Sequence, residues 1–412
     1  MQPRKKLKML FFLRKFPTLS ETFIVNQITY LICQGHDVHI LAEQKTKSPV
    51  HPEIDKFKLM EKVTYADYYT SHQKRYFKAF PKLLKLLKSK PKSFFQSLNF
   101  FKHGRFSASL RLPTDLFAVQ QLNEDFDIVH AHFGYMGEIF LSLKQMGFFQ
   151  NAELITTFHG VDMKPTELKK NRRRYQNIFQ QNVRLTTNNP YGKELIQKIK
   201  PNYENISILP VGLDTEYFKG KIKNQNFTVL FCGRFVEFKA AVLIPEIAEY
   251  LKKDGQLNDT QFVLIGSGSQ DRKIRKLVKN YKLQNHFKML GDLTQDQVKK
   301  EMQKASVFLM PGIVESSGRA ETQGLVIQEA QAMQVPVLVS DAGGMKYGMS
   351  NSKTGYVIPE NDIAGYAEKI KFFKDNPEKR KQMGKAAREY VLKNFDSKVL
   401  GKQLEKIYRE AL

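Results

Sequence analysis

The chain has 412 residues, 42% of them hydrophobic, and a formal net charge of +25. This length allows two domains of about 150 to 200 residues, each with an ordinary core. The two cysteines, Cys33 and Cys232, imply no disulfide framework and suit a reducing compartment, and no apolar run approaches the roughly 18 residues of a membrane-spanning helix.

The first part of the chain alternates short apolar runs with amphipathic stretches. A buried strand is expected over 7–13, an apolar run too short for a signal core, followed by a helix over 20–35. Further strands are expected over 37–42, 127–133, 153–157, 186–189 and 206–210. Strands that alternate with helices predict a parallel sheet covered by helices on both faces.

A basic insert at about 74–111 contains no Asp or Glu and many Phe and Leu residues. Helical spacing is shared by the basic residues Lys78, Lys82, Lys85 and Lys88 and by the apolar residues Phe80, Leu84 and Leu87. This pattern predicts an amphipathic helix, limited by Pro81 to start there, that lies on an anionic membrane surface. The alternative is an ordinary helix whose apolar face meets the core. No motif supports nucleic acid as a partner.

A polar segment broken by glycine, 213–226, has no hydrophobic period and is predicted as a linker. It separates an N-terminal domain, 1–212, from a C-terminal domain, 227–395, and a last helix over 396–412 follows. The second domain is expected to hold strands over 228–232, 261–265, 286–290, 306–310 and 335–340. The fold class is therefore α/β, with two doubly wound, Rossmann-like domains that face a central cleft.

Two glutamates eight residues apart, Glu321 and Glu329, carry the strongest functional signal. A helix is expected to begin at Gly324, which places Glu329 in its second turn and Glu321 in the preceding loop. The helix N-terminus offers free amides and a positive dipole to a diphosphate, and a carboxylate deeper in the groove accepts hydrogen bonds from two ribose hydroxyls. The spacing predicts a sugar-nucleotide site, with a solvated helix start as the alternative.

Two cations, Arg234 and Lys239, follow the first strand of the second domain. At the carboxyl edge of the sheet they would offset the charge of a diphosphate leaving group without a metal, whereas such a pair standing alone is more typical of surface charge. Gly266 follows the next strand in a turn that resembles a nucleotide-binding turn. The third glycine of a dinucleotide fingerprint is absent, which argues against a nicotinamide enzyme.

Histidines end two strands of the first domain. His159 follows the strand over 153–157 and is expected to face the cleft as a hydrogen-bond partner for sugar or phosphate, with a packed strand-end histidine as the alternative. His130 and His132 share one face of a strand, but no third ligand stands at a diagnostic spacing, so no metal is expected. Asp125 and Asp127 precede a strand and indicate a turn.

These segments together resemble glycosyltransferase family 4, the retaining GT-B enzymes, over nearly the whole chain. The best match is 318–332, where the family carries a glutamate, seven residues and a second glutamate. The stretches 16–24 and 127–134 look like the exopolysaccharide and lipopolysaccharide branch. Two positions and one stretch depart from the family pattern and bear on the identity of the sugar: Ala240, Thr322 and the stretch from Met345 to Tyr347.

The resemblance implies roles for individual residues. Donor binding falls to Arg234, Lys239, Gly266, Glu321, Gly324, Leu325 and Glu329; catalysis to His159, Glu321, Arg234 and Lys239; and the acceptor side to Ser20, Glu21 and Thr22. It also implies retention of configuration without a covalent carboxylate intermediate, with the leaving phosphate assisting deprotonation of the acceptor. The last helix would cross back onto the first domain.

The leading hypothesis is a cytoplasmic enzyme, peripherally bound to the inner face of the plasma membrane, without a cofactor. It would transfer a hexosyl group from a UDP- or GDP-linked sugar to a lipid-linked glycan or polysaccharide precursor in bacterial cell-surface polysaccharide biosynthesis. Two alternatives are a nucleotide-sugar epimerase of GT-B type and a nonenzymatic basic binding protein.

Overall fold

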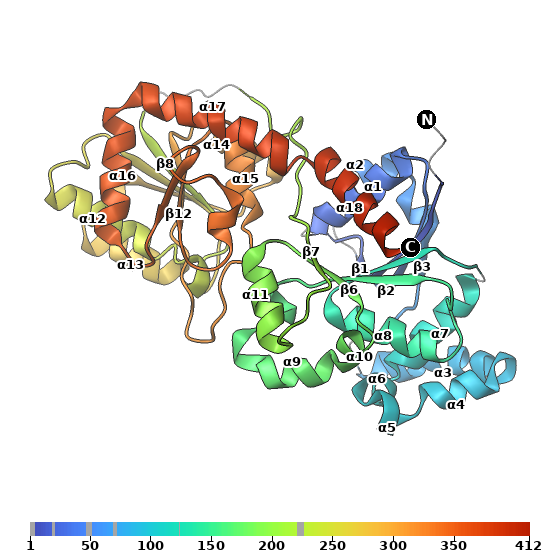
Figure 1. The fold of residues 1–412 in the computed structure, drawn as a ribbon. Helices are drawn as coiled ribbons and strands as arrows, with labels where there is room; N and C mark the ends of the chain where they lie inside the picture. Colours follow the sequence, from blue (N-terminus) through green and yellow to red (C-terminus); the bar gives the residue numbers. More distant parts are fainter. Residues whose placement is uncertain (1–4, 19–20, 47–51, 69–71, 123, 221–225) are drawn as a thin grey trace.

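The computed structural model describes residues 5–18, 21–46, 52–68, 72–122, 124–220 and 226–412, which form two lobes, each built on one parallel sheet (Figure 1). The predicted α/β class with two doubly wound domains is confirmed. Among the described residues, no helix is long and apolar enough to cross a membrane.

The N-terminal lobe holds a seven-stranded sheet in the order β3-β2-β1-β4-β5-β6-β7. Its strands are β1 (Lys8–Phe16), β2 (Asp37–Lys45), β3 (Val63–Tyr65), β4 (Ile128–His132), β5 (Glu153–Thr157), β6 (Arg184–Thr187) and β7 (Ile206–Ile208). Its helices are α1 (Thr22–Cys33), α2 (Pro52–Lys56), α3 (His72–Ser89), α4 (Pro91–Ser97), α5 (Phe100–His103), α6 (Arg105–Ala108), α7 (Arg111–Leu122), α8 (Gly134–Gln145), α9 (Leu168–Arg174), α10 (Gln176–Gln180) and α11 (Pro190–Ile199). Separate apolar clusters form on the sheet's two faces, because successive side chains of its buried strands point to opposite sides.

The C-terminal lobe holds a six-stranded sheet in the order β10-β9-β8-β11-β12-β13. Its strands are β8 (Thr228–Cys232), β9 (Gln261–Ile265), β10 (Phe287–Gly291), β11 (Val307–Met310), β12 (Val337–Ser340) and β13 (Gly355–Ile358). Its helices are α12 (Leu243–Lys253), α13 (Asp271–Asn280), α14 (Gln295–Met302), α15 (Leu325–Ala332), α16 (Ile363–Asp375) and α17 (Pro377–Asn394). Since all strands are parallel, their carboxyl ends gather at one edge, where loops can build a site.

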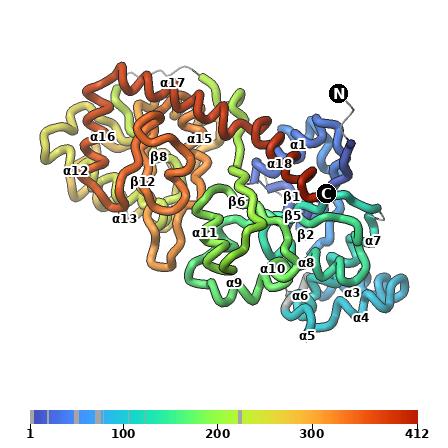
Figure 2. Tube along the Cα trace, in the orientation of Figure 1, coloured from blue at the N-terminus to red at the C-terminus, as the bar shows by residue number. Residues whose placement is uncertain are grey.

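The last helix, α18 (Ser397–Ala411), packs on the N-terminal lobe, against α1. Leu404 and Tyr408 are fully buried there, in the same apolar cluster as β1 and α1. The chain passes between the lobes at 209–213 and again between α17 and α18 (Figure 2). The two crossings are bonded together, because the Leu213 amide donates to the Phe395 carbonyl at 3.0 Å.

The segment predicted as a linker, 213–226, is partly built into the C-terminal lobe. Leu213 and Phe218 are buried in that lobe's core. The sequence of this polar segment does not predict these two contacts, because a single apolar side chain in a loop shows no hydrophobic periodicity.

The basic insert forms the helices α3 to α6, at the margin of the N-terminal lobe in Figure 1. The prediction that a helix starts at Pro81 is wrong, since Pro81 lies inside α3. A proline within a helix leaves the carbonyl four residues earlier without its usual donor. That carbonyl belongs to Phe77, whose side chain is 80% exposed, so solvent can reach the region and the helix continues.

Candidate active site

A cavity of about 720 Å³ lies between the lobes and is lined from both sides. The N-terminal lobe contributes Thr22, Pro52, Phe133, His159, Gly160 and Val161. The C-terminal lobe contributes Cys232, Gly233, Arg234, Phe238, Lys239, Leu293, Thr294, Gln295, Val298, Arg319, Ala320, Glu321, Thr322, Gly324, Leu325, Val326 and Glu329. The predicted acids and cations of the second domain therefore meet a predicted histidine of the first.

Glu321 and Lys239 form an ion pair inside this cavity. The Lys239 Nζ lies 2.5 Å from the Glu321 Oε2, and the side chains are only 12% and 15% exposed. The other carboxylate oxygen accepts from the backbone amides of Thr322 and Gln323, at 3.1 and 3.4 Å. Burial alone would raise the pKa of Glu321, but Lys239 and these amides hold it below its usual value. The carboxylate is therefore ionised and held in one orientation.

Glu329 stands one helical turn into α15, as the sequence predicts. The helix begins at Leu325, immediately after Gly324, whose φ of 73° lies in the left-handed region that favours glycine. Burial raises the pKa of Glu329 to about 7, although the charge of Lys239 opposes the rise. Near neutral pH this side chain can thus exist as a carboxylate or as a carboxylic acid.

Lys239 ends a short 3₁₀ turn, Glu237–Lys239, in the loop after β8. The next residue, Ala240, has a φ of 50°, which a glycine adopts without the steric cost that a Cβ brings. This left-handed backbone suits the glycine that the family resemblance implies at this position. Arg234, in the same loop, is exposed, and no carboxylate among the described residues pairs with it.

Gly266 lies behind the loop that carries Arg234 and is not among the residues that line the cavity. A side chain at Gly266 would overlap the backbone carbonyl of Gly233. The amide of Gly266 donates to the Gly291 carbonyl at 2.8 Å. Its role in this geometry is close backbone packing that supports the cation loop.

His159 reaches the cavity from the end of β5. Its Nε2 lies 3.3 Å from the Nδ1 of His132, and its ring lies 4.6 Å from the ring of Phe133. Burial lowers the pKa of His159 to about 4, so the ring is neutral at physiological pH. A neutral imidazole offers a hydrogen bond rather than a positive charge.

His130 is fully buried and bonds Tyr408 and Thr157, at 2.6 and 2.7 Å.

The three residues predicted for the acceptor side have different positions. Thr22 lines the cavity at the start of α1. Glu21 precedes it and is not a lining residue; burial raises its pKa against the opposing charges of Arg14 and Lys15. Ser20 lies outside the described residues.

The sequence assigned no role to several side chains that line the cavity. Arg319 stacks on Phe238, with the guanidinium carbon 4.2 Å from the ring centroid. Phe133 has a φ of 75° and packs beside His159. Phe133 and Arg319 lie inside recognised motifs, and Phe238 lies between the two predicted cations. This position in the sequence is the only signal that could have indicated their place in the site.

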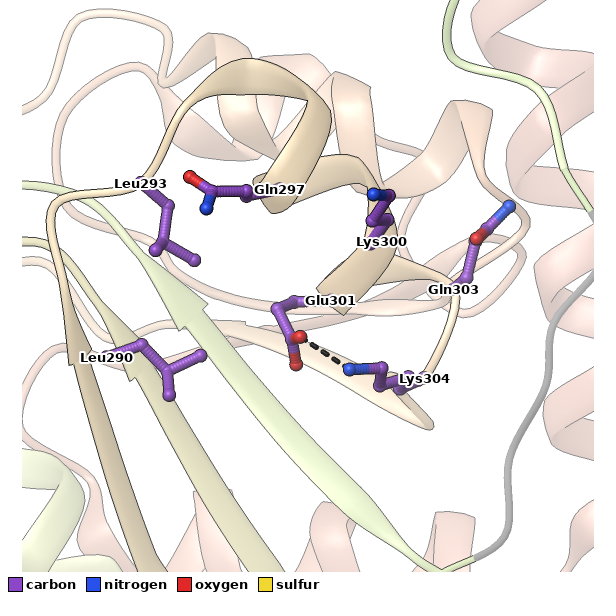
Figure 3. Close-up of a pocket in the computed structure, with 7 residues that line it drawn as sticks. All are labelled: Leu290, Leu293, Gln297, Lys300, Glu301, Gln303 and Lys304. Carbon is purple, nitrogen blue, oxygen red and sulfur yellow. Dashed lines mark hydrogen bonds and ion pairs between the residues drawn. The ribbon is translucent and has the colours of Figure 1, made fainter.

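A second hollow of about 700 Å³ lies between α14 and β10 (Figure 3). Its residues come from α14 and the segments that flank it, and its acid, Glu301, is paired with Lys304 at 2.6 Å. The hollow shares Leu293 with the cleft but takes no residue from the N-terminal lobe. The cleft is the better candidate because acids, cations and a histidine converge there.

Within the described part of the chain, no group of three or more His, Cys, Asp or Glu residues is placed to hold a metal ion. The positive charge that the cleft itself supplies comes from Arg234, Lys239 and Arg319. These side chains are suited to an anionic ligand.

Family models match both lobes. Residues 20–217 match the model described as Glycosyltransferase Family 4, and residues 214–390 match the model described as Glycosyl transferases group 1. The putative colanic acid biosynthesis glycosyltransferase WcaL of Salmonella typhimurium is 28% identical over 97% of this chain and 98% of its own. The amylovoran biosynthesis glycosyltransferase AmsK of Erwinia amylovora is 26% identical over 88% and 89%.

Solved structures share the fold. A glycosyltransferase from Rickettsia africae superposes with a TM-score of 0.71 at 17% identity, covering 99% of both chains. The Anabaena protein Alr3699/HepE, solved in complex with UDP, gives 0.72 at 14% identity over 98% of this chain and 100% of its own. The two lobes thus have the GT-B architecture, and, with family models matched to both of them, the chain belongs to glycosyltransferase family 4 and is a glycosyltransferase.

Proposed function

We propose that this glycosyltransferase moves a hexosyl group, with retention of configuration and without a metal, from a UDP- or GDP-linked sugar to a lipid-linked glycan or polysaccharide precursor. The observation that carries the proposal is the convergence of Glu321, Glu329, Arg234 and Lys239 on one cleft, opposite His159. The acceptor enters from the N-terminal lobe, where Thr22 lines the cavity. Family membership favours transfer over the epimerase and the nonenzymatic alternative.

Each group has a task in the proposed reaction. Glu329 accepts hydrogen bonds from the ribose hydroxyls, and Arg234 and Lys239 offset the charge that develops on the diphosphate as the sugar leaves. The carboxylate of Glu321 orients the sugar through its hydroxyls, and neutral His159 adds a hydrogen bond from the other lobe. The acceptor hydroxyl attacks the anomeric carbon while its proton passes to an oxygen of the departing phosphate, so no protein nucleophile is needed.

The relatives narrow the biological setting that we propose. WcaL and AmsK carry names that place them in colanic acid and amylovoran biosynthesis, and a structural neighbour holds UDP. We infer that the chain works in bacterial cell-surface polysaccharide biosynthesis, with UDP-linked sugars as the first donors to test.

A direct assay tests this function. The enzyme is incubated with UDP- and GDP-hexoses and lipid-linked oligosaccharides, and the product is examined by mass spectrometry and by NMR of the new anomeric centre. A product one hexose larger, with the donor's anomeric configuration, supports the proposal. Conversion of the donor sugar without an acceptor product would favour the epimerase, and an inverted linkage would refute retention.

We expect donor binding to depend on pH through Glu329. Its pKa of about 7 means that the side chain is largely protonated at pH 6 and largely ionised at pH 8. Only the carboxylate accepts two ribose hydrogen bonds, so affinity for a nucleotide sugar should rise by up to about tenfold between these values, with release of a proton on binding. Calorimetry with UDP-glucose at both values measures the change. Glu329→Gln should bind UDP-glucose weakly, and its affinity should not change with pH. If the affinity of this variant still rose with pH, a group other than Glu329 would be responsible for the pH dependence.

We also propose that the insert docks on an anionic membrane surface. Large apolar side chains on α3, α4 and α5, and Leu98 directly after α4, are exposed: Tyr76, Phe77, Phe80, Leu84, Phe95, Leu98, Phe100 and Phe101. Phe101 is 99% exposed, whereas Ala79 and Leu86 on α3 face the core. These exposures disfavour the alternative in which the whole apolar face of the helix meets the core.

The lysines of the insert do not all belong to this surface. Lys82 bonds the Ala66 carbonyl at 2.8 Å and pairs with Asp67 at 3.0 Å, with its side chain 19% exposed. Lys85 and Lys88 are exposed and remain available to anionic lipid. The proposed electrostatic contact therefore excludes Lys82.

Replacing Lys85 and Lys88 by Gln should weaken binding to phosphatidylglycerol vesicles by roughly tenfold or more, because each lysine near such a surface contributes about 1 kcal/mol. Phe77→Ser with Phe101→Ser should weaken it further by removing inserted apolar area. Lys381→Gln with Lys385→Gln on α17 is the matched control, with the same charge change on the other lobe. Equal binding by all variants in vesicle sedimentation would refute docking through the insert.

A further inference from the structure

The loop 320–324 is held by both lobes at once. Glu321 faces the C-terminal lobe and pairs with Lys239. The next two residues also bond outside that lobe: the Thr322 carbonyl accepts from Asn189 of the N-terminal lobe, and the Gln323 side chain bonds Val211 in the segment that crosses between the lobes. Consecutive residues therefore tie the Glu321 carboxylate to the C-terminal lobe and its neighbouring backbone to the other lobe and to the crossing segment.

Gln323 pairs its amide with both backbone groups of Val211, which lies just after β7. The Val211 amide donates to the Gln323 Oε1 at 2.8 Å, and the Gln323 Nε2 donates to the Val211 carbonyl at 2.8 Å. The Gln323 side chain is buried. A closed amide pair of this kind fixes both the distance and the orientation of the two segments.

Asn189 makes the second connection. It caps α11, at the junction of the lobes in Figure 1, and its Oδ1 accepts from the Gly192 amide at 3.1 Å. This cap turns the Nδ2 toward the C-terminal lobe, where it donates to the carbonyls of Thr322 and, at 3.4 Å, of Gly344. The helix cap thus determines which way the amide points.

The same loop meets the segment that carries His159. A Cβ built on Gly160 would lie 2.7 Å from the Thr322 Cγ2, so the Gly160 backbone lies close against the Thr322 side chain. Separation of the lobes would break the bonds of Asn189 and open this contact, whereas Gln323 holds the loop to the segment that crosses between the lobes. The contacts of Glu329 and Arg234 do not change with such a motion, because both residues lie within the C-terminal lobe.

We propose that Asn189 and Gln323 are positioning residues that bring Glu321 into its working position only when the lobes are together. The inference rests on the proposed function, in which Glu321 orients the donor sugar. It separates two steps: the nucleotide binds to the C-terminal lobe alone, and the sugar is oriented by a loop that the N-terminal lobe supports. Misplacement of such a group lowers the rate of transfer far more than it lowers nucleotide affinity.

The test uses variants that remove these bonds without removing the helix cap. Asn189→Ser keeps an oxygen that caps α11 but is too short to reach Thr322, and Gln323→Met keeps the side-chain length without polar atoms. Each should lower kcat for transfer by about tenfold or more and leave the Kd for UDP within twofold of wild type. Gln331→Met is the matched control: Gln331 is buried on α15 and donates to the Gly348 carbonyl at 2.8 Å, within the same lobe.

The outcomes separate this inference from the proposed function. Absence of transfer and of binding of both UDP and GDP in the wild type would refute the proposed function. Wild-type kcat in Asn189→Ser and Gln323→Met would refute the inference alone. A fall in kcat matched by Gln331→Met, or by an equal loss of UDP affinity, would also refute it, because general destabilisation would then explain the result. Thermal unfolding of every variant shows whether the fold is intact.

Discussion

Replacing Glu321 by Gln is expected to lower kcat for sugar transfer by about 10² to 10³ while the Kd for UDP changes less than threefold. The substitution preserves size but removes a charge that Lys239 and two backbone amides orient within the cleft. An amide presents one acceptor instead of two and leaves the Lys239 ammonium without its partner. Steady-state kinetics with a saturating donor, together with calorimetry of UDP, measures both quantities.

Glu315→Gln is the matched control for this prediction. Glu315 stands on the same loop but does not line the cavity, and its carboxylate bonds the Ser317 hydroxyl. Its replacement should leave kcat within twofold. If Glu321→Gln and the wild type had equal kinetics, Glu321 would have no role in catalysis. The spacing of the two glutamates would then have no catalytic meaning.

Lys239→Met is expected to cause a larger loss, about 10³ or more in kcat/KM, because Lys239 acts on two partners. It supplies positive charge for the diphosphate, and it holds Glu321 ionised in a position where burial would otherwise raise the pKa of that carboxyl. The variant should therefore lose affinity for UDP as well as the rate of transfer. It should also bind UDP more weakly than Glu321→Gln does, which kinetics and calorimetry on the same preparations will show.

Lys304→Met provides the comparison for Lys239. Lys304 pairs with Glu301 at 2.6 Å in the hollow between α14 and β10, in the same lobe but outside the cleft. Its loss should not alter UDP binding. The double variant Lys239→Met with Glu321→Gln should lose less activity than the two single losses multiplied, since both break one ion pair. A loss of activity in the double variant equal to the product of the two single losses would show that the two residues act independently.

Local patterns predicted much of the fold. The strands over 153–157, 228–232 and 261–265 begin and end where the apolar runs do, because a strand buried on both faces appears as a continuous apolar segment. The short edge strands β3 and β13 were not predicted: three or four residues show no period, and pairing with a neighbouring strand alone defines them. The prediction of a helix start at Pro81 was wrong because exposure of the preceding turn, which a sequence does not show, decides whether a helix tolerates proline.

The same distinction applies to the candidate site: local sequence predicts the positions of some of its residues, and only the tertiary structure places the others. Gly324 and Glu329 could be placed from the sequence because a helix start and its second turn are set by neighbours a few residues away. The sequence predicted Gly266 as part of a nucleotide-binding turn, whereas in the structure it packs against the Gly233 backbone and does not line the cleft. Phe133, Phe238 and Arg319 could not be assigned, because their approach to the ligand space depends on how loops from separate strands pack.

Composition and local order therefore account for the two parallel sheets, the order of their elements, the cations after β8 and the glutamate pair ahead of and within α15. Each of these follows from interactions between residues near one another in the chain. The tertiary structure alone decides that His159 lines the same cavity as Glu321 and that Gln323 bonds Val211, 112 residues away. Those contacts arise from the placement of two separately folded sheets, and a hydrogen bond that depends on that placement leaves no periodic signal in the sequence.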